Sequence, residues 1–215
     1  MDLEQARERL FAALSREVPD RRVIRAMRAI RRELFVPPDR IHVAYEDIPV
    51  PIGEGQTVSQ PYIVALMTSS LHVYSRDKVL EVGTGSGYQA AILSLLARRV
   101  ITVERVSSLA DAARARLEWL RRHNVKVVPA GETLGCPEEA PFDCIIVAAG
   151  APHLPGELVG QLAPGGRMVI PIGSRYEQNL TQVIRTQEGI SVHTLWPCRF
   201  VPLIGKGAWP LEEVQ

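Results

Sequence analysis

Apolar side chains near the start of the chain recur at helical spacing. The pattern predicts a first amphipathic helix over residues 3–14 and a second over residues 23–34. The second should end before Pro37 and Pro38, because proline cannot continue a helix. Residues 44–55 are rich in proline and glycine and show no period, so we expect an irregular surface segment of the kind that often carries binding residues.

The pattern changes after residue 57. Thr57 and Ser59 precede Pro61 and an apolar stretch over residues 63–71, which is typical of a helix with a hydroxyl cap and a proline in its first turn. Strand-like apolar runs then alternate with helical patterns. Strands are predicted over residues 79–82, 101–104, 125–128, 142–149 and 168–172, and helices over residues 89–97, 108–122 and 158–162.

This alternation predicts an α/β fold with a doubly wound, mostly parallel sheet, as in Rossmann-like proteins. Two last apolar segments, residues 180–185 and 192–201, predict an antiparallel pair at the edge of the sheet. A chain of 215 residues suits one domain. We expect a helical lead-in and substrate loop over residues 1–56, an α/β core over 57–205 and a tail over 206–215.

Composition and charge exclude several classes of protein. Hydrophobic residues make up 46% and charged residues 23%, which is ordinary for a globular domain. The net charge of +1 gives no global field that would draw the chain to nucleic acid. No apolar run is long enough to span a membrane, and the N-terminus is not a secretory signal. We expect a cytoplasmic protein with neither nucleic-acid nor membrane partners.

Six arginines crowd the region of the second predicted helix. We favour a solvated helix face, and an acidic partner is the alternative. The six are Arg21, Arg22, Arg25, Arg28, Arg31 and Arg32.

The cysteines and histidines give no sign of a metal site. The three cysteines have no CxxC spacing, and Cys144 lies in an apolar run typical of a buried strand. The five histidines are scattered without ligand spacing. We expect reduced structural thiols and no metal. The residues are Cys136, Cys144, Cys198, His42, His72, His123, His153 and His193.

The strongest local signal is VLEVGTGSGYQAA at residues 79–91, where a strand runs into a glycine turn and then a helix. Gly83, Gly85 and Gly87 would let a ligand approach the backbone, and the helix start offers unpaired NH groups. Glu104 ends the next predicted strand, where an acidic side chain can accept hydrogen bonds from ribose hydroxyls. The GxGxG spacing, with Glu81 placed to hold a cationic amino-acid group, favours S-adenosylmethionine over a nicotinamide cofactor.

Nearly the whole chain resembles one family. The blocks that carry the resemblance are AMRAIRRELFVP at residues 26–37, AYEDIPVPIG at 44–53, GEGQTVSQPYIVALM at 53–67, KVLEVGTGSGYQAAIL at 78–93, APFDCIIVAA at 140–149, LAPGGRMVIPIG at 162–173 and RFVPLIG at 199–205. They are similar to successive blocks of protein-L-isoaspartate O-methyltransferases. The glycine block is shared by many methyltransferases, whereas GQTVSQP and RFVPL are more particular to this family.

The resemblance implies an enzyme that repairs proteins. It implies transfer of a methyl group from S-adenosylmethionine, with S-adenosylhomocysteine as product, to the free α-carboxylate of L-isoaspartyl residues in damaged proteins and peptides. D-aspartyl residues are a possible second acceptor. The ester can then cyclise to a succinimide and reopen partly as normal aspartate. We expect a monomer.

Ser59 is the catalytic residue that the resemblance favours. A hydroxyl at a helix start can orient the incoming carboxylate, helped by backbone NH groups and the helix dipole. Its other interpretation is an ordinary N-cap, and both roles could coexist. The resemblance extends cofactor binding to Gln56, Thr57, Val58, Glu81, Gly83, Thr84, Gly85, Ser86, Gly87, Glu104, Arg105, Gly131 and Glu132, and substrate binding to Ile52, Thr57, Ser59, Val201, Pro202 and Leu203.

The chain departs from the family at one position. Family members show an aspartate, thought to recognise the adenine, where this chain has Gly131 in AGETLG at residues 130–135. Glu132 could replace it through a shifted loop, or backbone groups and packing could hold the adenine. This departure leaves two alternatives open: a methyltransferase of the same fold with another acceptor, and a non-catalytic binding paralogue.

Overall fold

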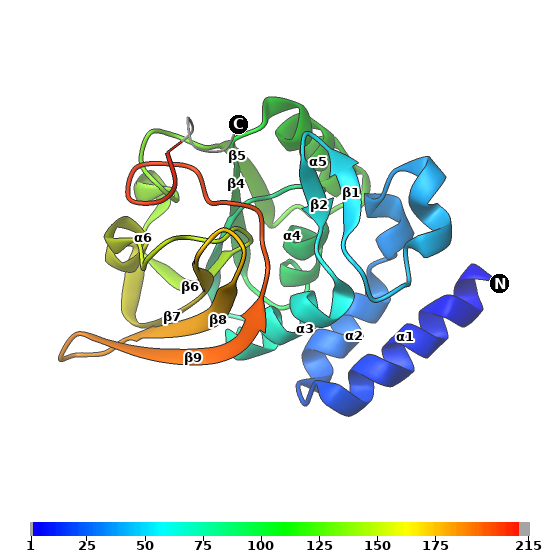
Figure 1. The fold of residues 1–215 in the computed structure, drawn as a ribbon, viewed down its shortest axis with the longest axis horizontal. Helices are drawn as coiled ribbons and strands as arrows, with labels where there is room; N and C mark the ends of the chain where they lie inside the picture. Colours follow the sequence, from blue (N-terminus) through cyan, green and yellow to red (C-terminus); the bar gives the residue numbers. More distant parts are fainter. Residues whose placement is uncertain (1, 211–215) are drawn as a thin grey trace.

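A computed structural model describes residues 2–210. Its centre is a seven-stranded sheet in the order β5-β4-β3-β6-β7-β8-β9, with helices on both faces (Figure 1). Strands β3 to β7 run parallel, and β8 and β9 pair antiparallel at one edge. This architecture confirms the predicted doubly wound sheet with an antiparallel edge. The predicted tail falls partly outside the described residues, at positions 211–215.

The elements follow the predicted order along the chain. The strands of the large sheet are β3 (Lys78–Val82), β4 (Arg99–Glu104), β5 (Val125–Pro129), β6 (Phe142–Val147), β7 (Leu162–Gly173), β8 (Gln178–Arg185) and β9 (Ile190–Cys198). The helices are α1 (Leu3–Glu17), α2 (Arg21–Ala29), α3 (Pro61–Ser70), α4 (Tyr88–Leu93), α5 (Ser107–Trp119) and α6 (Gly156–Gly160). Short elements are η1 (Arg32–Phe35), η2 (Pro38–Val43), η3 (Pro137–Glu139), β1 (Val50–Gly53) and β2 (Gln56–Val58).

Alternate residues of the central strands pack on opposite faces of the sheet. Val79 and Cys144 face α3 and α4, in a cluster with Leu71 and Leu93. Leu80 belongs to the cluster on the other face, which α6 helps to cover. Because water is excluded from both faces, these strands read as nearly continuous apolar runs. Among the described residues, no helix is long and apolar enough to cross a membrane.

The second helix is shorter than the sequence pattern predicts. Helix α2 stops before Ile30, which is extended at φ −101° and ψ 115°, and the chain continues into η1. Arg32 is fully buried, with its Nε donating to the Ala44 carbonyl at 2.8 Å and its guanidinium 5.1 Å from the centre of the Tyr88 ring. The prediction of a solvated face was therefore wrong for Arg32, because carbonyls and an aromatic ring replace water around it.

Two further boundaries differ from the prediction. Residues 44–55 are not irregular throughout, since β1 pairs antiparallel with β2 around a turn in which Gly53, Glu54 and Gly55 all have positive φ. The strand predicted over residues 168–172 begins earlier, since β7 starts at Leu162, and its pairing with β6 shifts register between Leu162 and Arg167.

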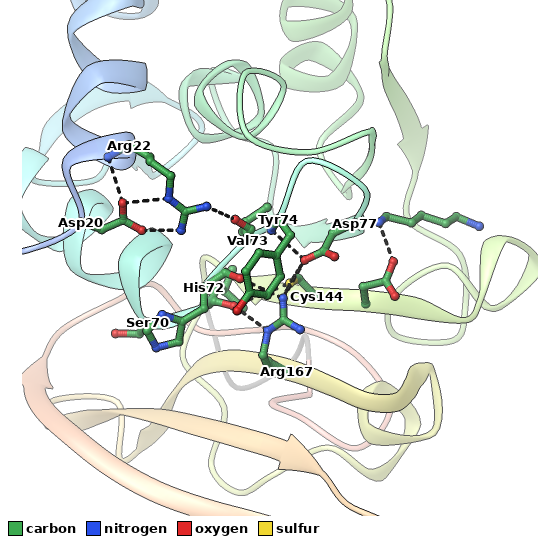
Figure 2. A network of polar contacts seen from close by, with 12 residues as sticks. Asp20, Arg22, Ser70, His72, Val73, Tyr74, Asp77, Cys144 and Arg167 are labelled. Atoms are coloured by element: carbon green, nitrogen blue, oxygen red, sulfur yellow. Dashed lines mark hydrogen bonds and ion pairs between the residues drawn. The ribbon is translucent and has the colours of Figure 1, made fainter.

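A polar network fixes the end of α3 to the sheet (Figure 2). Arg167 on β7 donates to the Leu71 carbonyl at 2.8 Å and pairs with Asp77 at 2.6 Å. Arg22 of α2 donates to the Val73 carbonyl at 3.0 Å. The Leu71 carbonyl is one that the helix end leaves without an intrahelical partner, and Val73 follows two residues later. Helix α3 is thus held at its C-terminal end by β7 and α2.

Candidate cofactor and acceptor site

A cavity of about 990 Å³ opens at the carboxyl ends of β3, β4 and β6. This edge of a doubly wound sheet is where such folds bind ligands, because the strand order reverses there. Besides these strand ends and part of α3, four segments form the walls: the glycine turn after β3, residues 130–135 after β5, residues 54–60 around β2, and residues 197–205 at and after the end of β9. The last region crosses from the antiparallel edge back towards β6 (Figure 1).

The glycine turn has the backbone conformation that the sequence requires. Gly83, Gly85 and Gly87 all have positive φ, at 96°, 51° and 85°. Gly83 and Gly85 line the cavity. Gly87 does not line it, because it faces α5, where an added Cβ would lie 3.4 Å from Ala113 and 3.5 Å from Leu117. Two of the glycines therefore shape the site, and the third lets α4 pack against α5.

Glu104 at the end of β4 is held in place before any ligand arrives. Its Oε2 accepts from the Gly85 amide at 2.8 Å, and its Oε1 accepts from the amides of Arg105 and Val106 at 2.9 and 3.0 Å. The side chain is only 8% exposed and lines the cavity. A carboxylate has about four lone-pair sites and three of them accept from these amides, so the remaining site on Oε2 can still accept from a ribose hydroxyl.

Glu81 on β3 is a buried acid with one oxygen unpaired. Its Oε2 accepts from the Thr102 hydroxyl at 2.6 Å, while its Oε1 has no hydrogen-bond partner. The residue is fully buried yet borders the cavity. Burial raises the pKa of Glu81 to about 8, the Thr102 bond opposes this, and the charge of Glu104 adds to it. An unpaired buried carboxyl beside a cavity fits a cationic ligand group.

Ser59 also lines the cavity and is half-buried. Within residues 2–210 its hydroxyl has no hydrogen-bond partner, so it is free to bind a ligand. The predicted hydroxyl cap was wrong: the N-cap of α3 is Gln60, which makes no cap bond of its own. Asp47 takes that role, accepting from the Tyr62 amide at 2.8 Å.

The segment after β9 is fixed by two residues that sequence reasoning did not find. The Gly150 amide donates to the Val201 carbonyl at 2.8 Å, and the Leu203 amide donates to the Gly150 carbonyl at 2.8 Å. The Gln178 side chain accepts from the Phe200 amide at 2.8 Å and donates to the Phe200 carbonyl at 3.3 Å. We call these contacts of Gly150 and Gln178 with residues 200–203 the clamp. A single glycine after β6 and a glutamine at the start of β8 form no motif that would have predicted it.

The loop after β5 leaves space where the family aspartate would lie. Gly131 and Glu132 both line the cavity and are exposed. A Cβ added at Gly131 would meet no atom within 4 Å. The loop therefore has room for a side chain at this position, and Glu132 is the acidic group available beside it.

Most of the predicted site residues converge on this cavity. Ile52 does not line it and lies behind the turn, where its Cδ1 would be 3.6 Å from a Cβ added at Gly85. Gly87 is the other exception. Those that line the cavity are Gln56, Thr57, Val58, Ser59, Glu81, Gly83, Thr84, Gly85, Ser86, Glu104, Arg105, Gly131, Glu132, Val201, Pro202 and Leu203.

The fold and the site together define a class of protein. A doubly wound sheet with an antiparallel edge, a GxGxG turn, an acid-ended β4 and a buried acid on β3 characterise a methyltransferase that uses S-adenosylmethionine. The model of the protein-L-isoaspartate(D-aspartate) O-methyltransferase family matches residues 5–208. The chain belongs to this family.

Named relatives agree over nearly full length. The chain is 50% identical to a protein-L-isoaspartate O-methyltransferase of Geobacter metallireducens, over 99% of this chain and 100% of the relative. It is 49% identical to one of Methanoculleus marisnigri, over 94% and 92% of the two chains.

Solved structures show the same likeness. A crystal structure from Plasmodium falciparum, described as a putative protein-L-isoaspartate O-methyltransferase in complex with S-adenosyl-L-homocysteine, matches with a TM-score of 0.79 at 28% identity. The match covers 91% of this chain and 96% of that one. A second protein-L-isoaspartate O-methyltransferase has a TM-score of 0.83 at 28% identity and covers 94% of this chain and 67% of its own.

Proposed function

We propose that the chain methylates the free α-carboxylate of L-isoaspartyl residues in damaged proteins and peptides, with S-adenosylmethionine as the methyl donor. One observation carries the proposal: a single cavity is lined both by the two acids of a cofactor site, Glu81 and Glu104, and by Ser59 with its unpaired hydroxyl. The proposal includes D-aspartyl residues as a second acceptor. We further propose that the enzyme is monomeric and cytoplasmic and has no nucleic-acid partner.

The acceptor needs little chemical activation. An α-carboxyl group has a pKa of about 3.5, so it is already an anionic nucleophile at neutral pH. The bound cofactor would supply an electrophilic methyl group on a sulfonium. The protein's part is then to align the carboxylate oxygen with that methyl group and to exclude water, where held geometry can lower a barrier by about 7 to 11 kcal/mol.

The cofactor would be held on the wall formed by β3 and β4. Glu104 would accept bonds from the ribose hydroxyls, since its carboxylate is already oriented by three backbone amides. Glu81 would face the cationic amino-acid group with its unpaired Oε1. Gly131 and Glu132 would border the adenine, with Glu132 in place of the family aspartate.

Ser59 would bind the acceptor carboxylate through its hydroxyl. At the N-terminus of α3 the Tyr62 amide is already taken, because it donates to the Asp47 carboxylate. The Ser59 hydroxyl is therefore the group that we assign to orient the acceptor. The backbone of Val201 to Leu203, fixed by Gly150, would support the peptide beside it.

A variant of Ser59 separates the acceptor role from the cofactor role. In Ser59→Ala we expect kcat on an isoaspartyl peptide to fall about tenfold or more, while the Kd for S-adenosylhomocysteine stays within about twofold. Initial rates and calorimetric titration give the two values. Equal loss of both would place Ser59 in the cofactor site and remove its assignment to the acceptor.

The same titration tests the competing functions. Cofactor binding without methylation of any isoaspartyl peptide would favour another acceptor. Failure to bind either S-adenosylmethionine or S-adenosylhomocysteine would favour a non-catalytic paralogue.

A further inference from the structure

Helix α3 receives its N-terminal cap from a distant part of the chain. The N-cap residue Gln60 makes no cap bond, and Pro61 follows it. The cap comes from Asp47, whose Oδ1 accepts from the Tyr62 amide at 2.8 Å. The second oxygen, Oδ2, accepts from the Gln60 side chain at 2.9 Å. One carboxylate thus fixes both the first turn of α3 and the residue before it.

These contacts lie next to Ser59, the residue proposed to bind the acceptor. Ser59 immediately precedes Gln60, and both residues line the cavity. On the other side of Ser59, Val58 pairs with Val50 in the β1–β2 hairpin and is buried. The backbone of Ser59 is therefore held from one side by the hairpin and from the other by Asp47.

The loop that carries Asp47 is anchored in the core. Arg32 is fully buried, donates to the Ala44 carbonyl at 2.8 Å and to the Ile48 carbonyl at 3.3 Å, and lies 5.1 Å from the ring centre of Tyr88. Tyr88 is the first residue of α4, the helix that follows the glycine turn. Arg32 therefore connects the Asp47 loop to the cofactor side of the cavity.

We propose that Asp47 is a positioning residue that acts through Ser59, holding the serine hydroxyl in line with the acceptor carboxylate. The inference rests on the proposed function. A side chain that only capped a helix would affect stability alone. A side chain that positions Ser59 must also affect turnover, because alignment of the reacting groups supplies most of the catalysis in this reaction.

The central experiment is a double-mutant cycle with Ser59→Ala. We expect Asp47→Ala to lower kcat on an isoaspartyl peptide about tenfold in the wild-type background. In the Ser59→Ala background the same change should lower kcat by less than about twofold, since residues that act as one unit are not additive. The Kd for S-adenosylhomocysteine should stay within about twofold throughout. Equal losses in both backgrounds would overturn the proposal.

Two variants separate positioning from simple stability. Asp20 caps α2 by accepting from the Arg22 amide at 2.9 Å and, as Asp47 does with Gln60, also accepts from a side chain, that of Arg22 at 2.8 Å, so Asp20→Ala is a comparable loss of a helix cap at a residue that does not line the cavity. Both alanine variants should lower Tm by about 2–4 °C, but Asp20→Ala should keep wild-type kcat. Asp47→Asn retains an acceptor for the Tyr62 amide, so it should recover most of the turnover.

The outcomes distinguish the two claims. If Asp47→Ala loses stability like Asp20→Ala and keeps its kcat, Asp47 is only a cap and the inference is wrong. If the wild-type chain methylates no isoaspartyl peptide while it binds S-adenosylhomocysteine, the proposed function fails first and the inference falls with it.

Discussion

The Glu104 carboxylate accepts a hydrogen bond from the Gly85 amide at 2.8 Å. This contact joins the end of β4 to the turn after β3 and fixes the relative position of the two parts of the cofactor wall. Gly85 has a positive φ of 51°, a conformation that glycine adopts at little steric cost. Glu104 therefore holds the turn and leaves one lone-pair site on Oε2 for a ligand in the cavity.

The first prediction concerns Glu104→Gln. An amide in place of the carboxylate puts an NH₂ group against backbone NH donors and lacks the charge that strengthens bonds to hydroxyls. We expect the Kd for S-adenosylhomocysteine to rise about tenfold or more. Calorimetric titration measures it, with Glu118→Gln on the exposed face of α5 as a control of equal charge change. Unchanged affinity would remove the ribose assignment.

The second prediction concerns pH and Glu81. Its pKa is raised from 4.5 to about 8 by burial, so between these values the folded protein binds more protons than the unfolded chain. Stability without cofactor should therefore fall as pH rises through this window and level off above it. In Glu81→Gln this contribution is lost, and Tm should fall less between about pH 5 and about pH 8. Parallel pH profiles for the two proteins would contradict the assignment.

Glu81 also predicts how cofactor binding depends on pH. The ionised carboxylate attracts the cofactor's ammonium group, so binding should release a proton below about pH 8. Titration in buffers with different ionisation enthalpies should detect the release in the wild type and much less in Glu81→Gln. The same proton release in both proteins would assign it to another group.

The third prediction concerns the clamp after β9. A Cβ at Gly150 would lie 2.6 Å from the Gln178 side chain, which holds both backbone groups of Phe200. Gly150→Ala should displace this segment and raise the peptide KM several-fold, about threefold to tenfold, with little change in cofactor Kd. Gly160→Ala on α6, where an added Cβ meets nothing within 4 Å, is the matched control. Equal KM values for both variants would argue against a peptide role for the segment.

The sequence predicted the order of the sheet elements well, because their signals are local. An apolar strand runs into Gly83 and Gly85, and the next strand ends in Glu104. This pattern is typical of a doubly wound sheet that binds a nucleotide-like cofactor. The start of β7 was predicted too late, because residues 163–166 lie in an irregular part of its pairing with β6 that interrupts the apolar pattern. The spacing of apolar residues also failed to predict that Arg32 is buried. Periodicity alone does not show which polar side chain will find hydrogen-bond acceptors in the core.

The motif residues of the candidate site could be predicted from the sequence, but the residues that hold them in place could not. Ser59, Glu81 and Glu104 follow from short patterns, and all three line one cavity. Asp47 and Gln178 act across long separations in the chain, on the Tyr62 amide and on Phe200. Such contacts depend on tertiary packing, and they produce no characteristic residue spacing that a single sequence would show.

The most direct test of the account compares two synthetic peptides that differ only in one residue, isoaspartyl in one and normal aspartyl in the other. Transfer of labelled methyl from S-adenosylmethionine should occur to the isoaspartyl peptide alone, as a base-labile ester. Such transfer would also mean that the chain tolerates Gly131 in place of the family aspartate. Equal labelling of both peptides, or labelling of neither while cofactor still binds, would contradict the proposed repair function.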